Sequence, residues 1–587
     1  MLLDRYGKAI RHLTSEDFTR SAPVSIDKIP DALIDCTLAA EDKRFYRHHG
    51  IDVLATARAA WDFLRNRRVV SGASTVTQQL AKITSPPASR NLLSKFREVM
   101  IARRLEMSWS KRRILESYFS NLDYGNLRIG PTEAARFYFQ KPLADLSLGE
   151  CALLAGLPQA PSRLNPVRNP NNAKARKLVV LQRLAKTGKY DAAKIALARS
   201  EKIQLRPLRE RQSAPWLNRL RQAGGGKHTT LDLDLQKDIE QIVGEETSRL
   251  RDANLRHAAV VVIDNASGEI LGMVSSADWN DARGGQVHGA LSPRSPGSTL
   301  KPFTYLLSFR HLKHLPCTII ADIPTRLRTE QGLKLPENYD RTYRGPVTIR
   351  QALACSLNLP ALRELDALGG PGKLYDFLQQ LGIGGLNPNA AHYGLGLTLG
   401  NAPVGLLDLV NAYACIARSG NFMPTRLFLD DAKVPVKNLI DATDAYLIAD
   451  ILADPVARAP AFSTGGPLDL PFPCAVKTGT SSDFRDNWCI GFTPDFTVGV
   501  WAGNFENQPM KGISGVSGAG PIFHRTMVRA QRNIEPRWFA RPEGGEVVKV
   551  DFRTGKRLEH HTHPKFSLTE WIPPGRRIEA AADTDYD

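Results

Sequence analysis

The sequence predicts a multidomain protein in which a mostly α-helical domain is followed by a mixed α/β domain. Its length of 587 residues allows about two to four domains. Apolar residues recur three and four positions apart between about 27 and 189, which is the helical period. Further along, the apolar run 258–264 and the run 269–274 flank a cluster of turn residues, which predicts a β-hairpin. The hydrophobic content of 42% with 24% charged residues excludes disordered or fibrous classes for most of the chain.

Five segments are expected along the chain: an N-terminal segment 1–26, a helical domain 27–204, a basic linker 205–228, an α/β domain 229–535 and a short tail 536–587. The helical domain is predicted from runs such as 96–105, 111–118 and 148–157. Pro, Arg and the glycine run 224–226 mark the linker. The tail is polar and rich in His and Pro, and we interpret it as an appendage, not as a domain.

The charge of the chain is concentrated in its first part. The chain has 78 Lys+Arg and 60 Asp+Glu, a formal net charge of +18. Residues 1–230 hold 41 of the basic and 20 of the acidic residues, so the remainder, with 37 and 40, is close to neutral. A basic surface of this kind favours nucleic acid, anionic lipid head groups or a phosphorylated substrate, and composition alone does not choose among them.

The cysteines and the apolar runs give weaker information. Seven cysteines are scattered without a C-x-x-C pair, which predicts buried free thiols and neither a zinc site nor a disulfide framework. No stretch reaches the ~18–20 consecutive apolar residues of a membrane span. The first residues also lack the apolar core of a signal peptide, so nothing in the sequence as given directs export.

Three separated motifs in the second domain suit one acyl-transfer mechanism. They are Ser298-Thr299-Leu300-Lys301 before a helical run, Ser356-Leu357-Asn358 inside another helical run, and Lys477-Thr478-Gly479-Thr480 on a β-like segment. A serine followed by a lysine one helical turn later places hydroxyl and amine on one face, where burial and neighbouring cations lower the pKa of the amine. Ser298 is therefore predicted as the nucleophile and Lys301 as its proton acceptor.

The remaining residues of these motifs have complementary predicted roles. Ser356 relays a proton toward the leaving amine, and Asn358 holds Lys301 and the substrate amide. The acyl oxyanion needs two backbone N–H groups, for which we predict those of Ser298 and Thr480. The third motif is expected on an edge strand, where it pairs with a peptide and binds its carboxylate through Lys477, Thr478 and Gly479.

The ordered trio of motifs resembles the penicillin-binding transpeptidases. The neighbouring segments that also match are Arg294-Ser295-Pro296-Gly297 before the first motif, Gly491-Phe492-Thr493-Pro494 and Trp501-Ala502-Gly503-Asn504. Leu357 occupies the position where some β-lactamases carry Asp, which favours a transpeptidase. The resemblance implies an α/β domain of the serine β-lactamase type.

The basic domain contains a second set of motifs. They begin with Glu41-Asp42-Lys43-Arg44-Phe45-Tyr46-Arg47-His48-His49-Gly50 and Gly72-Ala73-Ser74-Thr75-Val76-Thr77-Gln78-Gln79-Leu80-Ala81-Lys82, and continue at 95–98, 114–118, 150–161 and 176–181. Together they cover roughly 37–185 and resemble the peptidoglycan glycosyltransferase module of class A penicillin-binding proteins. The resemblance implies a mostly α, lysozyme-like fold.

Glycosyl transfer requires these residue types. Joining two sugars at an anomeric carbon that carries a lipid pyrophosphate needs a carboxylate to deprotonate the acceptor hydroxyl and cations around the departing diphosphate. Glu41 is predicted as the general base, and the resemblance places Glu98 in the donor cleft, where it supports the leaving group or orients substrate. His48 is interpreted as a structural side chain that braces the loop. The residues expected to supply charge or hydrogen bonds to sugar and phosphate oxygens are Lys82, Lys95, Arg97, Arg103, Ser74, Thr75, Gln78 and Gln79.

Two positions depart from the glycosyltransferase pattern. Ser94 stands where the third motif begins with Arg, a charge for which we expect Arg90 or Arg97 to substitute. After Tyr118, Ser120 occupies the place of the usual Asn, which follows one position late as Asn121. The segment 511–524 is similar to the penicillin-binding protein 1C type, whose members carry an N-terminal membrane anchor and a C-terminal β domain. We therefore expect the chain to begin after its anchor and the tail to be a truncated or reduced C-terminal β domain.

The combined expectation is a bifunctional peptidoglycan synthase at the periplasmic face of the cytoplasmic membrane. It would polymerise lipid-linked disaccharide-pentapeptide into nascent peptidoglycan and cross-link stem peptides through an acyl-Ser298 intermediate. β-Lactams as covalent inhibitors and an anionic membrane surface are the expected partners, nucleic acid is not, and no cofactor is required, with Mg²⁺ or Mn²⁺ left open for the glycosyltransferase site. Two alternatives stay open: a wall-binding or β-lactam-sensing protein with an impaired glycosyltransferase site, and an acyl-serine carboxypeptidase or β-lactamase.

Overall fold

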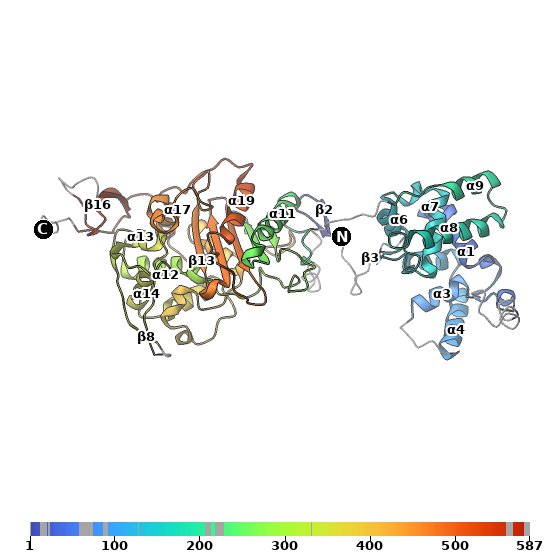
Figure 1. Cartoon of the computed structure of the whole chain (residues 1–587), viewed down its shortest axis with the longest axis horizontal. Helices are drawn as coiled ribbons and strands as arrows, with labels where there is room; N and C mark the ends of the chain where they lie inside the picture. The colour runs from blue at the N-terminus through green and yellow to red at the C-terminus, as the bar shows by residue number, and fades with distance from the viewer. Residues whose placement is uncertain are drawn as a thin grey trace. The chain divides into compact units, whose positions relative to one another are not determined.

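The computed structural model divides the chain into two units, one formed by 12–211 and the other by 1–11 together with 212–587 (Figure 1). The described residues are 2–11, 20–21, 24–57, 61, 74–85, 92–126, 128–205, 213–217, 228–329, 332–558 and 567–579. The N-terminal segment expected as 1–26 is divided between the units. Its strands β1 (Leu2–Leu3) and β2 (Ala9–Arg11) form a hairpin in the larger unit, where Arg5 forms an ion pair with Glu269 at 3.2 Å.

The smaller unit is helical, as predicted. Its helices are α1 (Asp31–Glu41), α3 (Val76–Ile83), α4 (Leu92–Ser108), α5 (Lys111–Asn121), α6 (Pro131–Phe139), α7 (Leu148–Gly156), α8 (Pro170–Ala185) and α9 (Ala192–Ser200). Two short strands, β3 (Arg20–Ser21) and β4 (Arg128–Ile129), pair in parallel, and 3₁₀ turns lie at Ile26–Lys28, Phe45–Arg47, Leu143–Asp145 and Leu157–Gln159. The helical runs predicted around 96–105, 111–118 and 148–157 correspond to α4, α5 and the segment that begins with α7.

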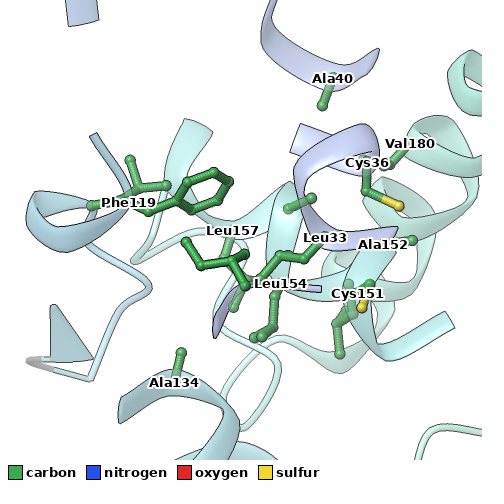
Figure 2. Close-up of a cluster of buried hydrophobic side chains, with 14 of the residues drawn as sticks. Leu33, Cys36, Ala40, Phe119, Ala134, Cys151, Ala152, Leu154, Leu157 and Val180 are labelled. Carbon is green, nitrogen blue, oxygen red and sulfur yellow. The ribbon is translucent and has the colours of Figure 1, made fainter. Parts of the chain in front are cut away.

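The core of the smaller unit forms around α1, α7 and α8. Helix α7 begins with a capping box, in which Ser147 accepts the Glu150 N–H and Glu150 accepts the Ser147 N–H, and every residue of this helix except its first is buried. Figure 2 shows Leu33 and Cys36 of α1 in the same apolar cluster as Leu154 of α7 and Val180 of α8. This packing fixes α1, so that Glu41 stands at the end of a rigid helix.

The larger unit is built on an antiparallel five-stranded sheet with the order β13-β14-β15-β5-β6. Its strands are β13 (Ala475–Thr480), β14 (Asp486–Phe492), β15 (Phe496–Gly503), β5 (His257–Asp264) and β6 (Ile270–Val274). The helices are α11 (Leu233–Arg249), α12 (Lys301–Leu307), α13 (Ile349–Ala354), α14 (Asn358–Ala367), α15 (Gly372–Gln380), α16 (Leu406–Ala417), α17 (Ala442–Ala453), α18 (Pro455–Phe462) and α19 (Ala519–Gln531). Besides β1–β2, the described residues of this unit form four two-stranded pairs: β7 (Ile319–Asp322) with β10 (Gly345–Thr348), β8 (Leu327–Thr329) with β9 (Gly332–Lys334), β11 (Asn421–Phe422) with β12 (Lys437–Asn438), and β16 (Glu546–Asp551) with β17 (Ser567–Ile572). The predicted hairpin of the two apolar runs is β5–β6.

Helices cover both faces of the central sheet. Val498 and Val500 of β15 belong to one apolar cluster with Phe523 of α19, whereas Gly499 faces α16, where a Cβ would lie 2.1 Å from a methyl carbon of Val410. The alternation is that of a sheet buried on both sides. Strand β13 lies at the edge, as predicted for the Lys477-Thr478-Gly479 motif, so one side of its backbone has no partner within the sheet.

Two segments expected to lie outside the domains pack against the larger unit. Within the predicted linker, Trp216 is fully buried and its indole N–H donates to the Met273 carbonyl at 3.0 Å. In the tail, strands β16 and β17 form a hairpin whose Val548, Val550 and Ile572 pack against Leu315 and Cys317.

All seven cysteines are buried and free, as predicted. Among the described residues, no helix combines the length and the apolar character needed to cross a membrane.

Replacing Trp216 by Ala is expected to destabilise the larger unit by about 3–5 kcal/mol, because the change leaves a cavity and removes one of the two hydrogen bonds to the Met273 carbonyl, which keeps the one from Gln236. Thermal and urea unfolding of the full chain would measure the effect. Tyr6→Ala is the control, since this aromatic side chain of the same unit is exposed and its removal should cost less than about 0.5 kcal/mol. Equal midpoints for the two variants would show that the 213–217 segment does not anchor the chain.

Candidate active sites

The predicted nucleophile, Ser298, lies in a short 3₁₀ turn, Gly297–Leu300, directly before α12. Three hydrogen bonds hold the surrounding loop. The Tyr413 hydroxyl donates to the Thr299 carbonyl at 2.6 Å, the Trp488 indole donates to the Ser295 carbonyl at 2.7 Å, and the Ser295 hydroxyl donates to the Gly400 carbonyl at 2.7 Å. Buried side chains therefore fix the position of the half-buried Ser298.

Glycine allows this loop to lie directly against the edge strand. A Cβ on Gly479 of β13 would lie 2.3 Å from the Pro296 carbonyl oxygen, and one on Gly297 would lie 2.7 Å from that of Thr480. Gly400 closes the other side, where a Cβ would lie 2.3 Å from the Gly297 nitrogen and where φ is +81°. No side chain fits at these positions, so the backbone of the nucleophile loop contacts the strand itself.

The Ser356-Leu357-Asn358 motif lies between two helices, which corrects the prediction that it lies inside one. Helix α13 ends at Ala354 and α14 begins at Asn358. Ser356 has φ +60°, a left-handed conformation that a right-handed helix cannot contain. Such a conformation is costly for a non-glycine residue and is typical of functional sites.

Two buried lysines converge on Ser356. The Lys301 ammonium nitrogen lies 2.5 Å from the Ser356 carbonyl oxygen and 2.7 Å from Asn358 Oδ1. The Lys477 nitrogen donates to the Ser356 hydroxyl at 2.7 Å and to the Thr478 carbonyl at 2.8 Å. The structure thus brings together residues of all three motifs. Within the described part of the chain no hydrogen bond involves the Ser298 hydroxyl, and the transfer of its proton to Lys301 stays a prediction.

Burial changes the titration of both amines. It lowers the pKa of Lys477 to about 7. Burial, with the charge of Lys477 as a second cause, also holds the pKa of Lys301 well below its ordinary value. Removing water from an amine disfavours its charged form, and a second cation nearby adds to the effect. A neutral amine, able to accept a proton, is consequently accessible near neutral pH.

Sequence reasoning missed the residues that orient Asn358. The Asn338 side chain donates to both carboxylate oxygens of Asp322, at 2.8 and 2.9 Å, and accepts the Asn358 backbone N–H at 2.8 Å. The Asn358 amide in turn donates to the Glu337 carbonyl at 2.6 Å, which turns its oxygen toward Lys301. The only available signal was the polar run Glu337-Asn338-Tyr339-Asp340 ahead of the β10 strand, and it contains no spacing that points to Asn358.

In the smaller unit, Glu41 stands at the last position of α1 with both carboxylate oxygens engaged. The Gln79 amide donates to Oε2 at 2.9 Å, and Arg176 contacts Oε1 at 3.2 Å. The Tyr118 hydroxyl donates to Gln79 Oε1 at 3.0 Å, which fixes the direction of that amide. Burial lowers the pKa of Arg176. Arg176 and Tyr118 lay within matching segments but were not assigned to the site from sequence.

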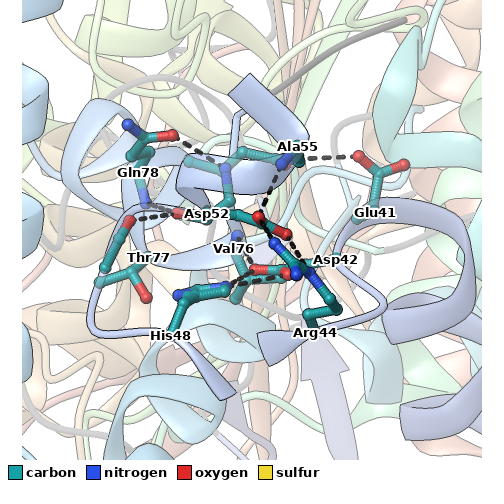
Figure 3. Close-up of polar contacts among 12 residues, drawn as sticks. Glu41, Asp42, Arg44, His48, Asp52, Ala55, Val76, Thr77 and Gln78 are labelled. Atoms are coloured by element: carbon teal, nitrogen blue, oxygen red, sulfur yellow. Dashed lines mark hydrogen bonds and ion pairs between the residues drawn. The ribbon is translucent and has the colours of Figure 1, made fainter. Parts of the chain in front are cut away.

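The neighbour of Glu41 has a structural role. Asp42 is buried, accepts hydrogen bonds from His48 at 2.9 and 3.0 Å, and accepts the Val76 N–H at the start of α3 at 3.0 Å (Figure 3). His48 therefore braces the loop, as interpreted from sequence. The same close-up includes the ion pair between Arg44 and Asp52, which holds the turn after α1.

The residues predicted to bind substrate differ in how accessible they are. Thr75 and Gln78 are buried and form the capping box of α3, so their hydrogen bonds serve the helix start, and their role in binding sugar or phosphate stays a prediction. Lys95 reaches both Ser74, at 3.0 Å, and Glu98, at 2.8 Å. Lys82, Arg97 and Arg103 are exposed.

The two departures from the expected pattern can be located only in part. The Ser120 hydroxyl accepts the Val24 N–H at 3.2 Å, and the Asn121 amide donates to the Ser117 carbonyl at 2.8 Å. Both side chains therefore bond to the backbone near α5. Arg90 and the Ser94 side chain lie outside the described residues.

Comparisons with known proteins match both parts of the chain. A family model described as transglycosylase matches residues 7–185, and one described as penicillin binding protein transpeptidase domain matches residues 258–528. Penicillin-binding protein 1C of Escherichia coli is 35% identical over 86% of this chain and 64% of its own length. Penicillin-binding protein 1B of Vibrio cholerae is 30% identical over 93% of this chain and 73% of its own length.

The chain spans 64% of the first of these relatives and 59% of penicillin-binding protein 1A/1B of Bacillus subtilis, so it corresponds to part of their length. The crystal structure of penicillin-binding protein 1A from Haemophilus influenzae superposes with a TM-score of 0.67 at 18% identity, covering 99% of this chain and 98% of that one. That likeness shows the fold.

The lowered pKa values predict how acylation of Ser298 depends on pH. Labelling by a fluorescent penicillin should proceed at neutral pH, because the pKa of Lys301 lies well below its ordinary value, and it should slow as the pH falls through about 7, where Lys477 takes up a proton. The second-order labelling rate would be measured between about pH 5 and pH 9. A rate that rises only above about pH 9 would contradict the assignment, since it would indicate a lysine with an ordinary pKa.

Proposed function

Because the chain belongs to the penicillin-binding proteins that join a transglycosylase to a transpeptidase domain, we propose that it is a bifunctional peptidoglycan synthase. The observation that carries the proposal is the convergence of Lys301, Lys477 and Asn358 on Ser356 beside the edge strand β13. The edge strand β13 can pair with an extended peptide, and Lys301 and Lys477 can move the protons of an acyl transfer that cuts and rejoins this peptide.

Cross-linking would begin at Ser298. Its oxygen attacks the carbonyl of the penultimate D-Ala of a stem peptide that pairs with β13, while Lys301 accepts the serine proton. Ser356, hydrogen-bonded to Lys477, passes a proton to the departing terminal D-Ala, and the backbone N–H groups of Ser298 and Thr480 bind the oxyanion. The amine of a second stem peptide then attacks the acyl-serine, forms the new amide bond and releases Ser298.

Polymerisation would use Glu41. Its carboxylate accepts the proton of the acceptor sugar hydroxyl, which attacks the anomeric carbon of the donor as the lipid pyrophosphate leaves. Gln79 and Arg176 hold the two carboxylate oxygens in place, and the exposed cations Lys82, Lys95 and Arg97 lie on α3 and α4 for the diphosphate. Glu98, which is paired with Lys95 at 2.8 Å, supports the leaving group or orients the substrate.

A divalent cation has no part in this proposed mechanism. Within the described ranges, no group of three or more His, Cys, Asp or Glu side chains could hold a metal ion. These residues do not fit a metal site made by protein side chains alone, and no step is derived through Mg²⁺ or Mn²⁺.

The protein is proposed to act at an anionic membrane surface, on the periplasmic side of the cytoplasmic membrane. Helix α4 exposes Phe96, Met100 and Met107, whose exposed fractions are 65%, 55% and 83%, together with Arg97 and Arg103. Apolar side chains next to basic ones are the pattern of surfaces that lie on anionic lipid. The lipid-linked substrate would be bound at the same surface.

The transpeptidase assignment predicts a covalent adduct. Fluorescent penicillin should label the wild-type protein, and Ser298→Ala should abolish labelling, because no other residue is proposed to form the acyl bond. Ser295→Ala is the matched control. It removes the hydrogen bond from Ser295 to the Gly400 carbonyl but keeps the Ser298 hydroxyl, so this variant should still be labelled in part. Labelling that persists in Ser298→Ala would remove Ser298 as the nucleophile, and an adduct lost within seconds would favour a β-lactamase.

The glycosyltransferase assignment predicts that Glu41→Gln reduces polymerisation of purified lipid-linked disaccharide by at least about 10²-fold, as expected for loss of a general base. Asp31→Asn, at the exposed first position of the same helix, is the control and should polymerise normally. Background-level product from wild type and Glu41→Gln alike would favour the wall-binding or β-lactam-sensing alternative.

A further inference from the structure

A buried arginine ties the C-terminal tail to the helix that leads to the acyl-transfer site. Arg350, the second residue of α13, has a side chain that is only 8% exposed. Its guanidinium is held by two bonds to Glu570 of β17, at 2.5 and 2.7 Å, and by Asp450 at 2.6 Å and Asp454 at 3.2 Å. Glu570 is itself buried, with a side chain that is 1% exposed.

The carboxylates come from three separate elements. Asp450 belongs to α17, Asp454 caps the start of α18, and Glu570 belongs to the tail hairpin. A fork-shaped guanidinium that satisfies several carboxylates fixes their relative positions more strictly than a single ion pair does. The start of α13 is therefore held at once by α17, by α18 and by the tail.

The tail also reaches the start of α13 through the backbone. Its hairpin packs Val548, Val550 and Ile572 on Leu315 and Cys317. Carbonyl groups of the adjoining residues bind the first two N–H groups of α13. The Arg350 N–H donates to the Pro316 carbonyl at 2.8 Å, and the Ile349 N–H donates to the Thr318 carbonyl at 2.9 Å. The Arg350–Glu570 salt bridge and the apolar packing of the hairpin therefore both hold the start of α13.

Helix α13 is short, and Ser356 follows two residues after its end at Ala354. The Ser356 N–H donates to the Leu353 carbonyl at 3.1 Å, and the Leu357 N–H donates to the Ala352 carbonyl at 2.9 Å. A displacement at Arg350 is therefore transmitted along one and a half turns of helix to a serine that already has a strained φ. Both catalytic lysines bond to this serine.

We propose that Glu570 is a positioning residue for the acyl-transfer site, and that the tail hairpin is a working part of the transpeptidase unit. The proposal rests on the proposed transpeptidase function. Through Arg350, Glu570 sets the position of α13 and thereby the distance from Ser356 to Lys301 and Lys477. Without Glu570 the arginine still has two aspartates, so the unit is expected to fold with Ser356 less strictly placed.

The test compares Glu570→Gln with Glu546→Gln in the full chain. Glu546 belongs to the other strand of the same hairpin and pairs with Arg557 at the surface, where its side chain is 52% exposed. We expect Glu570→Gln to lower the second-order rate of Ser298 labelling by fluorescent penicillin by about tenfold, and Glu546→Gln to change it less than about twofold. Both rates are measured well below the unfolding midpoint of each variant.

The pH profile separates positioning from mere stability. A loosened Ser356 no longer bonds fully to Lys477, so the acidic limb of the labelling profile should shift in Glu570→Gln, whereas a purely stabilising contact would leave its midpoint unchanged. Wild-type rate and midpoint in a folded Glu570→Gln would overturn the proposal. If that variant does not fold, Glu570→Asp decides: slower labelling supports positioning, and a wild-type rate overturns it. Absence of labelling in the wild type would instead count against the transpeptidase function.

Discussion

Two lysine side chains buried around one serine are the constraint on which the larger unit depends. Removing an ammonium group from water costs several kcal/mol unless the amine is neutral or well hydrogen-bonded. Here Lys301 and Lys477 receive their partners from Ser356 and Asn358, and their pKa values fall as a result of burial. The left-handed Ser356 follows from this requirement, because that conformation turns its carbonyl toward one lysine and its hydroxyl toward the other.

The two proposed sites solve opposite electrostatic problems. In the larger unit, desolvation lowers the pKa of buried ammonium groups, so that a lysine loses its proton near neutral pH and the neutral amine can accept the serine proton. In the smaller unit, a carboxylate stands in a strongly basic domain, where Arg176 and Gln79 hold its oxygens and exposed lysines and arginines remain for a pyrophosphate. This division suits the distribution of charge in the sequence, in which the excess of positive charge lies within residues 1–230 and the rest of the chain is close to neutral.

Sequence reasoning was most successful where chemistry and periodicity coincide. The edge strand with Lys477, the helical domain, the β5–β6 hairpin and the bracing role of His48 followed from pattern or motif. It was wrong in placing the Ser356-Leu357-Asn358 motif inside a helix, because a left-handed φ at a non-glycine residue has no signature in sequence. The cap formed by Thr75 and Gln78 could have been predicted as well, because a Thr three residues before a Gln describes the start of a helix. Arg350 and Glu570 are separated by 220 residues, so no local pattern could join them.

The central claim is that burial shifts the titration of the lysines that surround Ser356, and lysine side-chain NMR tests it most directly. With ¹⁵N-labelled lysine, the Nζ resonances of Lys301 and Lys477 would be assigned by difference in Lys301→Arg and Lys477→Arg and followed over pH. The account predicts a midpoint for Lys477 near the value of about 7 and one for Lys301 well below that of a free lysine. Midpoints of about 10.4 for both would contradict it, because the amines would then be charged and unable to accept the serine proton.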